Sequence, residues 1–198
     1  MDKREVRRFI DELRDEASKD YVPVMRKQTA ALLAEILREK RPRAVLEIGT
    51  CLGVSGLTVL NESEAFLTTV EIDEERWLKA KENFAKCGFS SRVNAILGDC
   101  REVLNAIDEE YDFVILDGPK SAYKDNFLQA FKLLPVGGAV FADDVSYHDK
   151  VNAEIVEHKH RTIVNGLRNF ISLIETDKRL KTTRYDLEDG VAVIERIG

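Results

Sequence analysis

Apolar residues in the first 43 positions recur at helical spacing. Residues 4–18 carry them every three or four positions between charged side chains, which predicts an amphipathic helix. Pro23 interrupts this pattern, and a second helix is expected to end near Lys40, before Arg41-Pro42-Arg43. The apolar positions are Val6, Phe9, Ile10 and Leu13 in the first helix and Ala30, Leu33, Ala34 and Leu37 in the second.

The pattern then changes to short apolar runs that alternate with helical segments. The runs are Ala44–Ile48, Phe66–Ile72, Val93–Leu97, Phe113–Leu116 and Ala139–Ala142. The helical segments are Asp73–Cys87, Arg101–Ile107 and Ser121–Leu134, and a further helix follows the first run. Strands alternating with helices predict βαβ units, in which a parallel sheet is covered on both faces.

The last 50 residues have a different order. Lys150–Lys178 is predicted as one long helix, and the runs Lys181–Asp186 and Val191–Ile194 follow it. Glu188-Asp189-Gly190 between these runs is a hairpin signal. We therefore expect an α/β fold: a Rossmann-like sheet of seven strands, mostly parallel, with a C-terminal antiparallel hairpin and helices on both faces.

Composition narrows the class of protein. The chain has 198 residues, 44% hydrophobic and 33% charged, which fits one globular domain over residues 1–198. No apolar run reaches the roughly 20 residues of a membrane span, so we expect a cytoplasmic protein without membrane contact. The three cysteines have no CxxC spacing and predict neither disulfides nor a zinc site. The net charge is +3 over residues 1–43 and −9 beyond them, which argues against a protein that coats nucleic acid but permits a local basic patch.

The loop after the first predicted strand has the composition of a ligand loop. Gly49, Gly53 and Gly56 let the backbone turn and approach a ligand closely. Their spacing is not the G-x-G-x-x-G pattern that binds a pyrophosphate. Glu47, just before the turn, would repel a pyrophosphate and suits a ligand that carries positive charge.

The next two strand ends also carry acids. Glu71 ends the second strand, where a carboxylate accepts from both hydroxyls of a ribose. Asp99 follows the third strand and could accept from an adenine amino group. Either acid alone could simply cap a helix. Three acids at consecutive strand ends favour a nucleoside ligand.

A second acidic cluster follows the fourth and fifth strands. Asp117, Asp143 and Asp144 should converge at one sheet edge and would repel each other unless a cation neutralises them. Their oxygens suit a hard divalent ion, Mg²⁺ first and Mn²⁺ or Ca²⁺ next, which could hold an acceptor hydroxyl. Lys120 is a candidate general base, or else an ion-pair partner of the aspartates. Asp143-Asp144 could also be an ordinary acidic turn.

From about Pro23 onward the chain resembles the metal-dependent O-methyltransferases that include the catechol and caffeoyl-CoA enzymes. The matching segments are Val45–Gly49 with Gly53 and Ser55, Tyr111–Asp117 with Lys120 and Tyr123, Gly137-Gly138 with Ala142-Asp143, and Asp189-Gly190. Two departures are Asp144, where the family usually carries Asn, and the loop Gly118-Pro119. The acid that helps to bind catechol has no counterpart, so catechol specificity is not expected.

The resemblance implies S-adenosylmethionine as cofactor and a role for each matching residue. Glu47, Gly49 and Ser55 would hold the methionine part, Glu71 the ribose, and Asp99 with Cys100 the adenine. Thr50, Cys51, Gly53, Ile72 and Asp117 complete the expected cofactor contacts. Asp117, Asp143 and Asp144 would bind the metal, with Lys120 as the base and Asp117 as its catalytic neighbour.

These observations predict an S-adenosylmethionine-dependent O-methyltransferase, for which we favour a small-molecule hydroxyl acceptor. His160–Phe170 is similar to a segment of bacterial enzymes that methylate 5-hydroxyuridine in tRNA, which makes tRNA the alternative acceptor. A nucleotide-linked oxidoreductase and a non-catalytic binding protein on the same fold are further alternatives. We expect the helices of residues 1–43 to cover the acceptor site or to form a dimer contact, and the protein to be a homodimer.

Overall fold

The structure is a computed structural model that describes all 198 residues. Its α-helices are α1 Lys3–Lys19, α2 Lys27–Lys40, α3 Val54–Glu62, α4 Glu74–Lys86, α5 Cys100–Ala106, α6 Tyr123–Lys132 and α7 Arg161–Thr176. Its strands are β1 Ala44–Ile48, β2 Phe66–Glu71, β3 Val93–Leu97, β4 Phe113–Leu116, β5 Ala139–Ala142, β6 Leu180–Tyr185 and β7 Val191–Arg196. Three short 3₁₀ turns are η1 Ser90–Arg92, η2 Lys120–Ala122 and η3 His158–His160.

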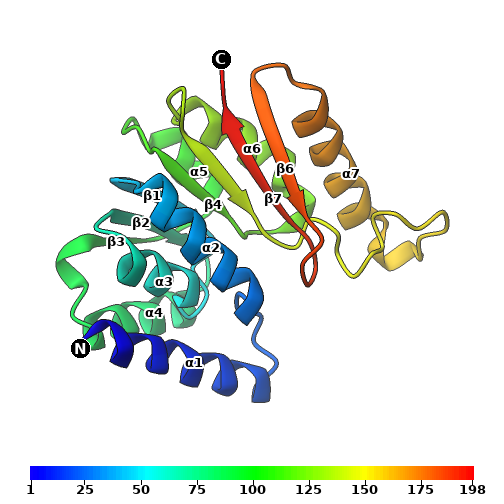
Figure 1. Cartoon of the computed structure of the whole chain (residues 1–198). Helices are drawn as coiled ribbons and strands as arrows, with labels where there is room; N and C mark the ends of the chain where they lie inside the picture. The colour runs from blue at the N-terminus through cyan, green and yellow to red at the C-terminus, as the bar shows by residue number, and fades with distance from the viewer.

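The strands form one seven-stranded sheet in the order β3-β2-β1-β4-β5-β7-β6 (Figure 1). The first five strands in this order are parallel, and β7 lies antiparallel between β5 and β6. The predicted sheet with its C-terminal hairpin is therefore confirmed. The order reverses between β1 and β4, the place where open α/β sheets bind ligands.

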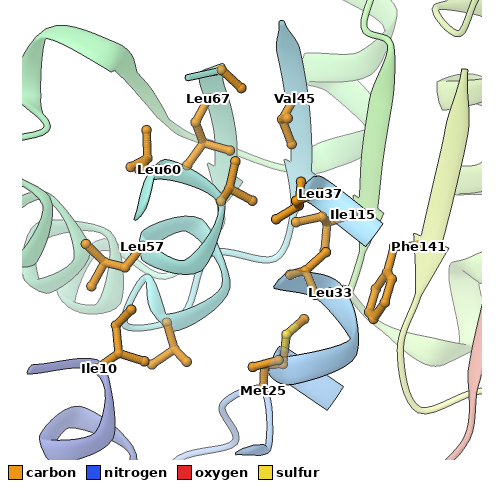
Figure 2. Packing of buried hydrophobic residues seen from close by; sticks show 14 of the residues in the cluster. Ile10, Met25, Leu33, Leu37, Val45, Leu57, Leu60, Leu67, Ile115 and Phe141 are labelled. Carbon is orange, nitrogen blue, oxygen red and sulfur yellow. The ribbon is translucent and has the colours of Figure 1, made fainter. Parts of the chain in front are cut away.

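Helices cover both faces of the sheet and bury a separate apolar core on each. On one face α2, α3 and α4 pack on the strands, and α1 lies against α3 on the outside (Figure 1). Figure 2 shows Leu33 and Leu37 beside Ile115 and Phe141 of the strands and Leu60 beside Leu67, whereas Leu57 lies toward Ile10 of α1. On the other face α5, α6 and α7 bury the second core. Residues of β4 are completely buried, as expected for a central strand with an uninterrupted apolar run.

The two N-terminal helices agree with their predicted spans. Asp2 caps α1 through the backbone N–H groups of Arg4 and Glu5, and the Glu5 side chain accepts from the Asp2 backbone N–H in return. This reciprocal capping box fixes the first turn of α1. None of the helices has the length and apolar character that crossing a membrane requires.

The long helix expected over Lys150–Lys178 is wrong in its first third. Helix α7 begins only at Arg161, and the chain from Lys150 to Glu157 forms turns. The Arg168 guanidinium donates to the carbonyl oxygens of Val151 at 2.9 Å and Ala153 at 2.6 Å. These carbonyls are therefore satisfied by a side chain instead of by a helical ladder.

Candidate functional site

A cavity of about 720 Å³ opens at the carboxyl ends of the parallel strands. Its walls come from the loops after β1, β2, β3, β4 and β5 and from the segment Pro23–Arg26 that precedes α2. The volume falls in the range of cavities that bind cofactors and small molecules. The location at the reversal of strand order is the one that the sequence predicts.

Gly49 is the point of closest approach between the loops after β1 and β4. It has φ +99°, and a Cβ placed on it would lie 2.9 Å from the backbone carbonyl carbon of Asp117. Any larger residue would push these two loops apart. Gly49, Thr50, Cys51 and Ser55, four of the residues expected to contact the cofactor, line the cavity, whereas Gly53, the N-cap of α3, does not.

Glu71 holds the loops after β1 and β2 together at the cavity wall. One carboxylate oxygen accepts from the Cys51 backbone N–H at 2.7 Å. The other accepts from the backbone N–H groups of Ile72 and Asp73 at 3.0 Å each. A carboxylate has about four acceptor positions, so Glu71 keeps capacity for a ligand hydroxyl. Ile72 beside it exposes an apolar side chain to the cavity.

Glu47 lies behind the cavity wall and not on it, which differs from the expected direct contact. Alternation along β1 turns its side chain toward α3, where it is completely buried. The Thr69 hydroxyl donates to one carboxylate oxygen at 2.5 Å, and the other oxygen has no hydrogen-bond partner. Burial raises the pKa of Glu47 to about 7, although nearby Ser55 and Thr69 hydroxyls act to lower it.

At the end of β3, Asp99 and Cys100 both line the cavity. The Asp99 carboxylate caps α5 through the Arg101 backbone N–H at 2.9 Å and pairs with the Arg101 guanidinium at 2.6 Å. These contacts lower the pKa of Asp99 to about 2. Asp99 therefore caps a helix, which was the alternative interpretation of its position. Contact between Asp99 and an adenine stays a prediction. The Cys100 thiol lies 3.6 Å from the amide oxygen of buried Asn126, whose amide nitrogen has no partner.

Asp117, Lys120 and Tyr123 form a buried polar cluster after β4. The Lys120 ammonium donates to Asp117 Oδ1 and to the Tyr123 hydroxyl oxygen, each at 2.8 Å. It also lies 3.3 Å from Asp144 Oδ2. Burial acts to lower the pKa of Lys120, but Asp117, Tyr123 and Asp144 together raise it well above its usual value. Lys120 is thus an ammonium ion at neutral pH and an ion-pair partner of the aspartates.

Asp143 and Asp144 follow β5 directly beside Asp117, because Leu116 and Ala142 are paired in the sheet. The Asp144 backbone N–H donates to Asp143 Oδ1 at 2.7 Å. Burial, together with the charges of Asp117 and Asp144, raises the pKa of Asp143 well above its usual value. The three carboxylates therefore meet as predicted, with more negative charge than Lys120 alone neutralises.

The donor chemistry of this cluster fits a divalent cation, while its side chains do not form a ready coordination shell. Oxygen donors with an excess of negative charge are what Mg²⁺ or Mn²⁺ requires. In this structure, however, no three acidic, histidine or cysteine side chains are arranged as a metal site. The Lys120 ammonium lies between Asp117 and Asp144, so a metal would bind there in competition with it.

The N-terminal segment contributes cavity residues that no sequence motif identified. Met25 is buried in the core, and its carbonyl oxygen accepts from the Arg14 guanidinium at 3.0 Å. Arg26 follows it, lines the cavity and lies 4.0 Å from Asp144. Arg76 of α4 is a second cation on the wall. Only the general expectation that residues 1–43 cover the site pointed to this segment.

The sheet order and the cavity define the class of the protein. A cavity at the β1–β4 switch point, with Glu71 at the end of β2, Asp99 after β3 and an antiparallel β7, is the architecture of an S-adenosylmethionine-dependent methyltransferase. A model of the O-methyltransferase family matches residues 3–197. The chain belongs to this family, and the predicted enzyme class, an S-adenosylmethionine-dependent O-methyltransferase, is confirmed.

Individual relatives agree with this assignment. A proposed O-methyltransferase from Mycobacterium ulcerans is 32% identical over 187 residues, which cover 92% of this chain and 82% of the relative. A solved structure of a proposed caffeoyl-CoA O-methyltransferase from Staphylococcus aureus has a TM-score of 0.88 at 27% identity and covers 94% of this chain and 91% of its own. The O-methyltransferase TomG from Streptomyces achromogenes, solved in complex with SAM, has a TM-score of 0.86 at 21% identity. The match covers 96% of this chain and 89% of TomG. At that identity the likeness to TomG concerns the fold alone.

Proposed function

We propose that the main cavity holds S-adenosylmethionine along the ends of β1, β2 and β3. The loop from Gly49 to Ser55 would bind the methionine part through its backbone groups. Glu71 would accept from the ribose hydroxyls, and Ile72 would cover one face of the adenine. The observation that carries this proposal is Glu71: its carboxylate is fixed by three backbone N–H groups and still faces the cavity.

In this arrangement Glu47 supports the cofactor from behind the loop. Its unpartnered carboxylate oxygen lies in a low-dielectric environment, where a negative charge strongly favours a cation nearby. The positive ammonium and sulfonium groups of the cofactor supply such charge. We infer that cofactor binding favours the ionised form of Glu47.

The methyl acceptor would enter beside Asp117, Lys120 and Asp143. Transfer is an in-line displacement: an acceptor oxygen forms a bond to the methyl carbon while the carbon–sulfur bond breaks and S-adenosylhomocysteine leaves. Holding the two reactants in line accounts for most of the acceleration in such a step. The acceptor hydroxyl must also lose its proton. We propose that the polar cluster after β4 accepts this proton.

Lys120 and Asp117 would handle this proton as a pair. In the resting site Lys120 already carries a proton, so its first role is to stabilise the negative charge that develops on the acceptor oxygen. Lys120 can serve as the general base only after it has given up its own proton. Its contact with Asp117 at 2.8 Å provides a route for that transfer.

We propose that a divalent cation, Mg²⁺ first, binds to Asp117, Asp143 and Asp144. Such an ion lowers the pKa of a hydroxyl that it binds. The position of Asp143 and Asp144 directly beside Asp117 at the sheet edge supports this proposal. Because Lys120 lies against two of the three carboxylates, the cation would also release the ammonium from them and lower its pKa toward that of a base.

A small hydroxyl compound is the acceptor that we favour. The two arginines of the segment His160–Phe170, which suggested tRNA, each donate to backbone carbonyl oxygens of the preceding turns. Arg161 donates to the Val156 carbonyl oxygen at 3.2 Å, and the Arg168 guanidinium donates to the carbonyl oxygens of Val151 and Ala153. They stabilise the turns of residues 150–157, so fewer of their N–H groups remain for phosphates. A homodimer, a cytoplasmic location and a single catalytic unit over residues 1–198 complete the proposal.

Two experiments test this function. Isothermal titration with S-adenosylmethionine should give saturable heat, and Glu71→Gln should weaken it while Glu75→Gln, a first-turn acid of α4 outside the cavity wall, should not. Labelled methyl transfer is then measured to a panel of phenols and hydroxy acids and, separately, to unmodified cellular tRNA, with and without exhaustive chelation. No heat at millimolar cofactor would refute the cofactor site. Transfer to tRNA alone would refute the small-molecule acceptor, and transfer that survives chelation would refute the metal.

A further inference from the structure

The tip of the β6–β7 hairpin contacts two segments that border the acceptor side of the cavity. One is the stretch before α2, which ends at Arg26, and the other is the loop that leaves β5 at Asp144. The tip consists of Glu188, Asp189 and Gly190, a long way from both in sequence. Its residues do not line the cavity themselves.

Asp189 contacts one nitrogen-bearing side chain from each segment, Arg26 and His148. Its Oδ2 accepts from the Arg26 guanidinium, and its Oδ1 lies 3.0 Å from His148 Nδ1. The Asp189 side chain is 9% exposed, whereas those of Arg26 and His148 are 45% and 60% exposed. Solvent therefore screens the outer side of both contacts, and the loss of Asp189 costs mainly the hydrogen bonds to its buried carboxylate. Asp189 therefore connects the N-terminal segment to the loop after β5.

Glu188 fixes the beginning of α2. The N-cap residue of that helix is Arg26, whose side chain caps no backbone N–H. The Glu188 carboxylate supplies the missing acceptor: it binds the Thr29 backbone N–H at 2.9 Å and the Thr29 hydroxyl at 2.6 Å. A carboxylate at a helix N-terminus also interacts favourably with the helix dipole. The hairpin tip thus caps a helix that lies about 160 residues earlier in the chain.

Gly190 brings the tip into close contact with the loop after β5. It has φ +83°, and a Cβ placed on it would lie 2.9 Å from Ser146 Cβ. Backbone bonds run from Val145 N–H to the Gly190 oxygen at 3.0 Å and from Ser146 N–H to the Asp189 oxygen at 2.8 Å. Directly after this contact, Tyr147, His148 and Asp149 all have positive φ, between 46° and 59°.

The left-handed backbone conformation of these three consecutive non-glycine residues is unfavourable, at about 1–2 kcal/mol for each residue. Such a conformation persists only where its surroundings hold it in place. Ser146 and His148 contact the hairpin tip on one side of this loop, while the Tyr147 hydroxyl lies 3.1 Å from His160 Nδ1 on the other. Loss of the tip contacts should therefore let this loop relax.

We propose that Asp189 is a positioning residue for the methyl acceptor, because it ties Arg26 and His148 together and so sets the distance between the two segments that border the acceptor side. The proposal rests on the function proposed above, since it assigns that side of the cavity to the acceptor. The cofactor side is formed by the ends of β1 to β3, which the hairpin tip does not contact. Replacing Asp189 should consequently weaken acceptor binding and leave the affinity for the cofactor unchanged.

The test compares Asp189→Asn with a matched control, Glu195→Gln, in the full chain. Glu195 lies on β7, the strand that follows the hairpin tip, and pairs with Lys40 at the opposite end of α2, away from the cavity. Hydrogen exchange measured by mass spectrometry follows residues 20–26 and 144–151. Asp189→Asn should speed exchange in both segments together by about tenfold, as expected for one lost charge-assisted bond. Glu195→Gln should change neither.

Binding and kinetics separate positioning from general destabilisation. The Kd for S-adenosylhomocysteine should be equal in wild type, Asp189→Asn and Glu195→Gln. With whichever panel compound the wild type methylates, Asp189→Asn should raise the acceptor KM about tenfold and leave kcat within about twofold. Arg26→Gln should do the same, and the double variant should add nothing to Asp189→Asn.

The outcomes are distinguishable from those of the proposed function. Exchange that speeds up in one segment only, or equally in Glu195→Gln, would overturn the link between the segments. A weaker Kd for S-adenosylhomocysteine would show that Asp189 acts on the whole cavity. If the wild type methylates nothing, the acceptor assignment fails, while the exchange result still decides whether the hairpin tip holds both segments.

Discussion

Replacing Glu47 by Gln should stabilise the fold at pH 8 and have little effect at pH 4.5. The folded protein holds a proton on Glu47 up to a pKa of about 7, compared with 4.5 for an unburied glutamate. Unfolding therefore releases this proton between those two pH values, and the free energy of unfolding falls as the pH rises through the window. The neutral Gln side chain removes that dependence.

The magnitude follows from the shift. A difference of 2.5 between pKa values of 4.5 and about 7 corresponds to about 3 kcal/mol at pH 8. Glu47 is completely buried, so solvent screening does not reduce this value. For a chain of this length, about 3 kcal/mol raises the melting temperature by roughly 6–12 °C. The stabilised variant should bind S-adenosylhomocysteine more weakly, because it has lost the charge behind the cofactor loop.

The assay is urea unfolding of wild type and Glu47→Gln at pH 4.5, 6 and 8. The difference between the two free energies of unfolding should grow by about 3 kcal/mol across the series. Glu195→Gln is a control of opposite sign, because hydrogen bonding to Lys40 lowers the pKa of Glu195. That variant should lose stability at pH 8 and regain it in acid. A Glu47→Gln effect of equal size at pH 4.5 and pH 8 would refute the assignment of a raised pKa to burial.

Three further predictions concern the site directly. Gly49→Ala should destabilise the fold by about 3 kcal/mol or more in urea unfolding, because it adds a strained φ and a collision with the Asp117 carbonyl; unchanged stability would contradict the loop geometry. Glu71→Gln should weaken S-adenosylhomocysteine binding by roughly ten- to a hundredfold in calorimetry, the value of a hydrogen bond to a charged group; an unchanged Kd would remove Glu71 from the ribose. Lys120→Met should lower kcat by roughly 10²- to 10⁴-fold at unchanged cofactor affinity, and a rate equal to wild type would exclude Lys120 from catalysis.

The strands and the switch-point cavity could be predicted because their sequence signals are local. An uninterrupted apolar run such as Phe113–Leu116 is typical of a central strand that is covered on both faces, and the structure buries it completely. The residue that follows each strand is then carried to the same sheet edge by the fold itself. This is why Glu71, Asp99, Asp117 and Asp143 could be placed together from their positions alone.

The orientations of individual side chains were harder to predict, for physical reasons. Asp99 was expected at an adenine, yet the neighbouring Arg101 engages both of its carboxylate oxygens. Glu47 points to the face that α3 covers, because side chains alternate along β1, and it is completely buried there. The helix expected from Lys150 onward failed because Arg168, a residue of α7 itself, satisfies the carbonyls of the preceding turns.

The pairing of distant segments could not be predicted from the sequence, although Asp189-Gly190 was identified as a turn. Arg26 and Asp189 are 163 residues apart, and each lies in a stretch that reads as an ordinary helix start or turn. Only the hairpin pairing of β6 with β7 and the position of α2 on the sheet bring them together. The acceptor side of the cavity therefore depends on tertiary structure more than the cofactor side does.

The same contacts bear on Asp144, a further carboxylate beside Asp117 and Asp143. An additional carboxylate in a buried acidic cluster would normally be costly, since like charges close together repel strongly at low dielectric. Here the additional charge has two cations near it: Lys120 at 3.3 Å and Arg26 at 4.0 Å. Arg26 is itself held in place by Asp189. The tolerance for Asp at position 144 thus depends on the N-terminal segment and the hairpin tip. Arg26→Gln should accordingly make Asp144→Asn less destabilising in urea unfolding than it is in the wild type.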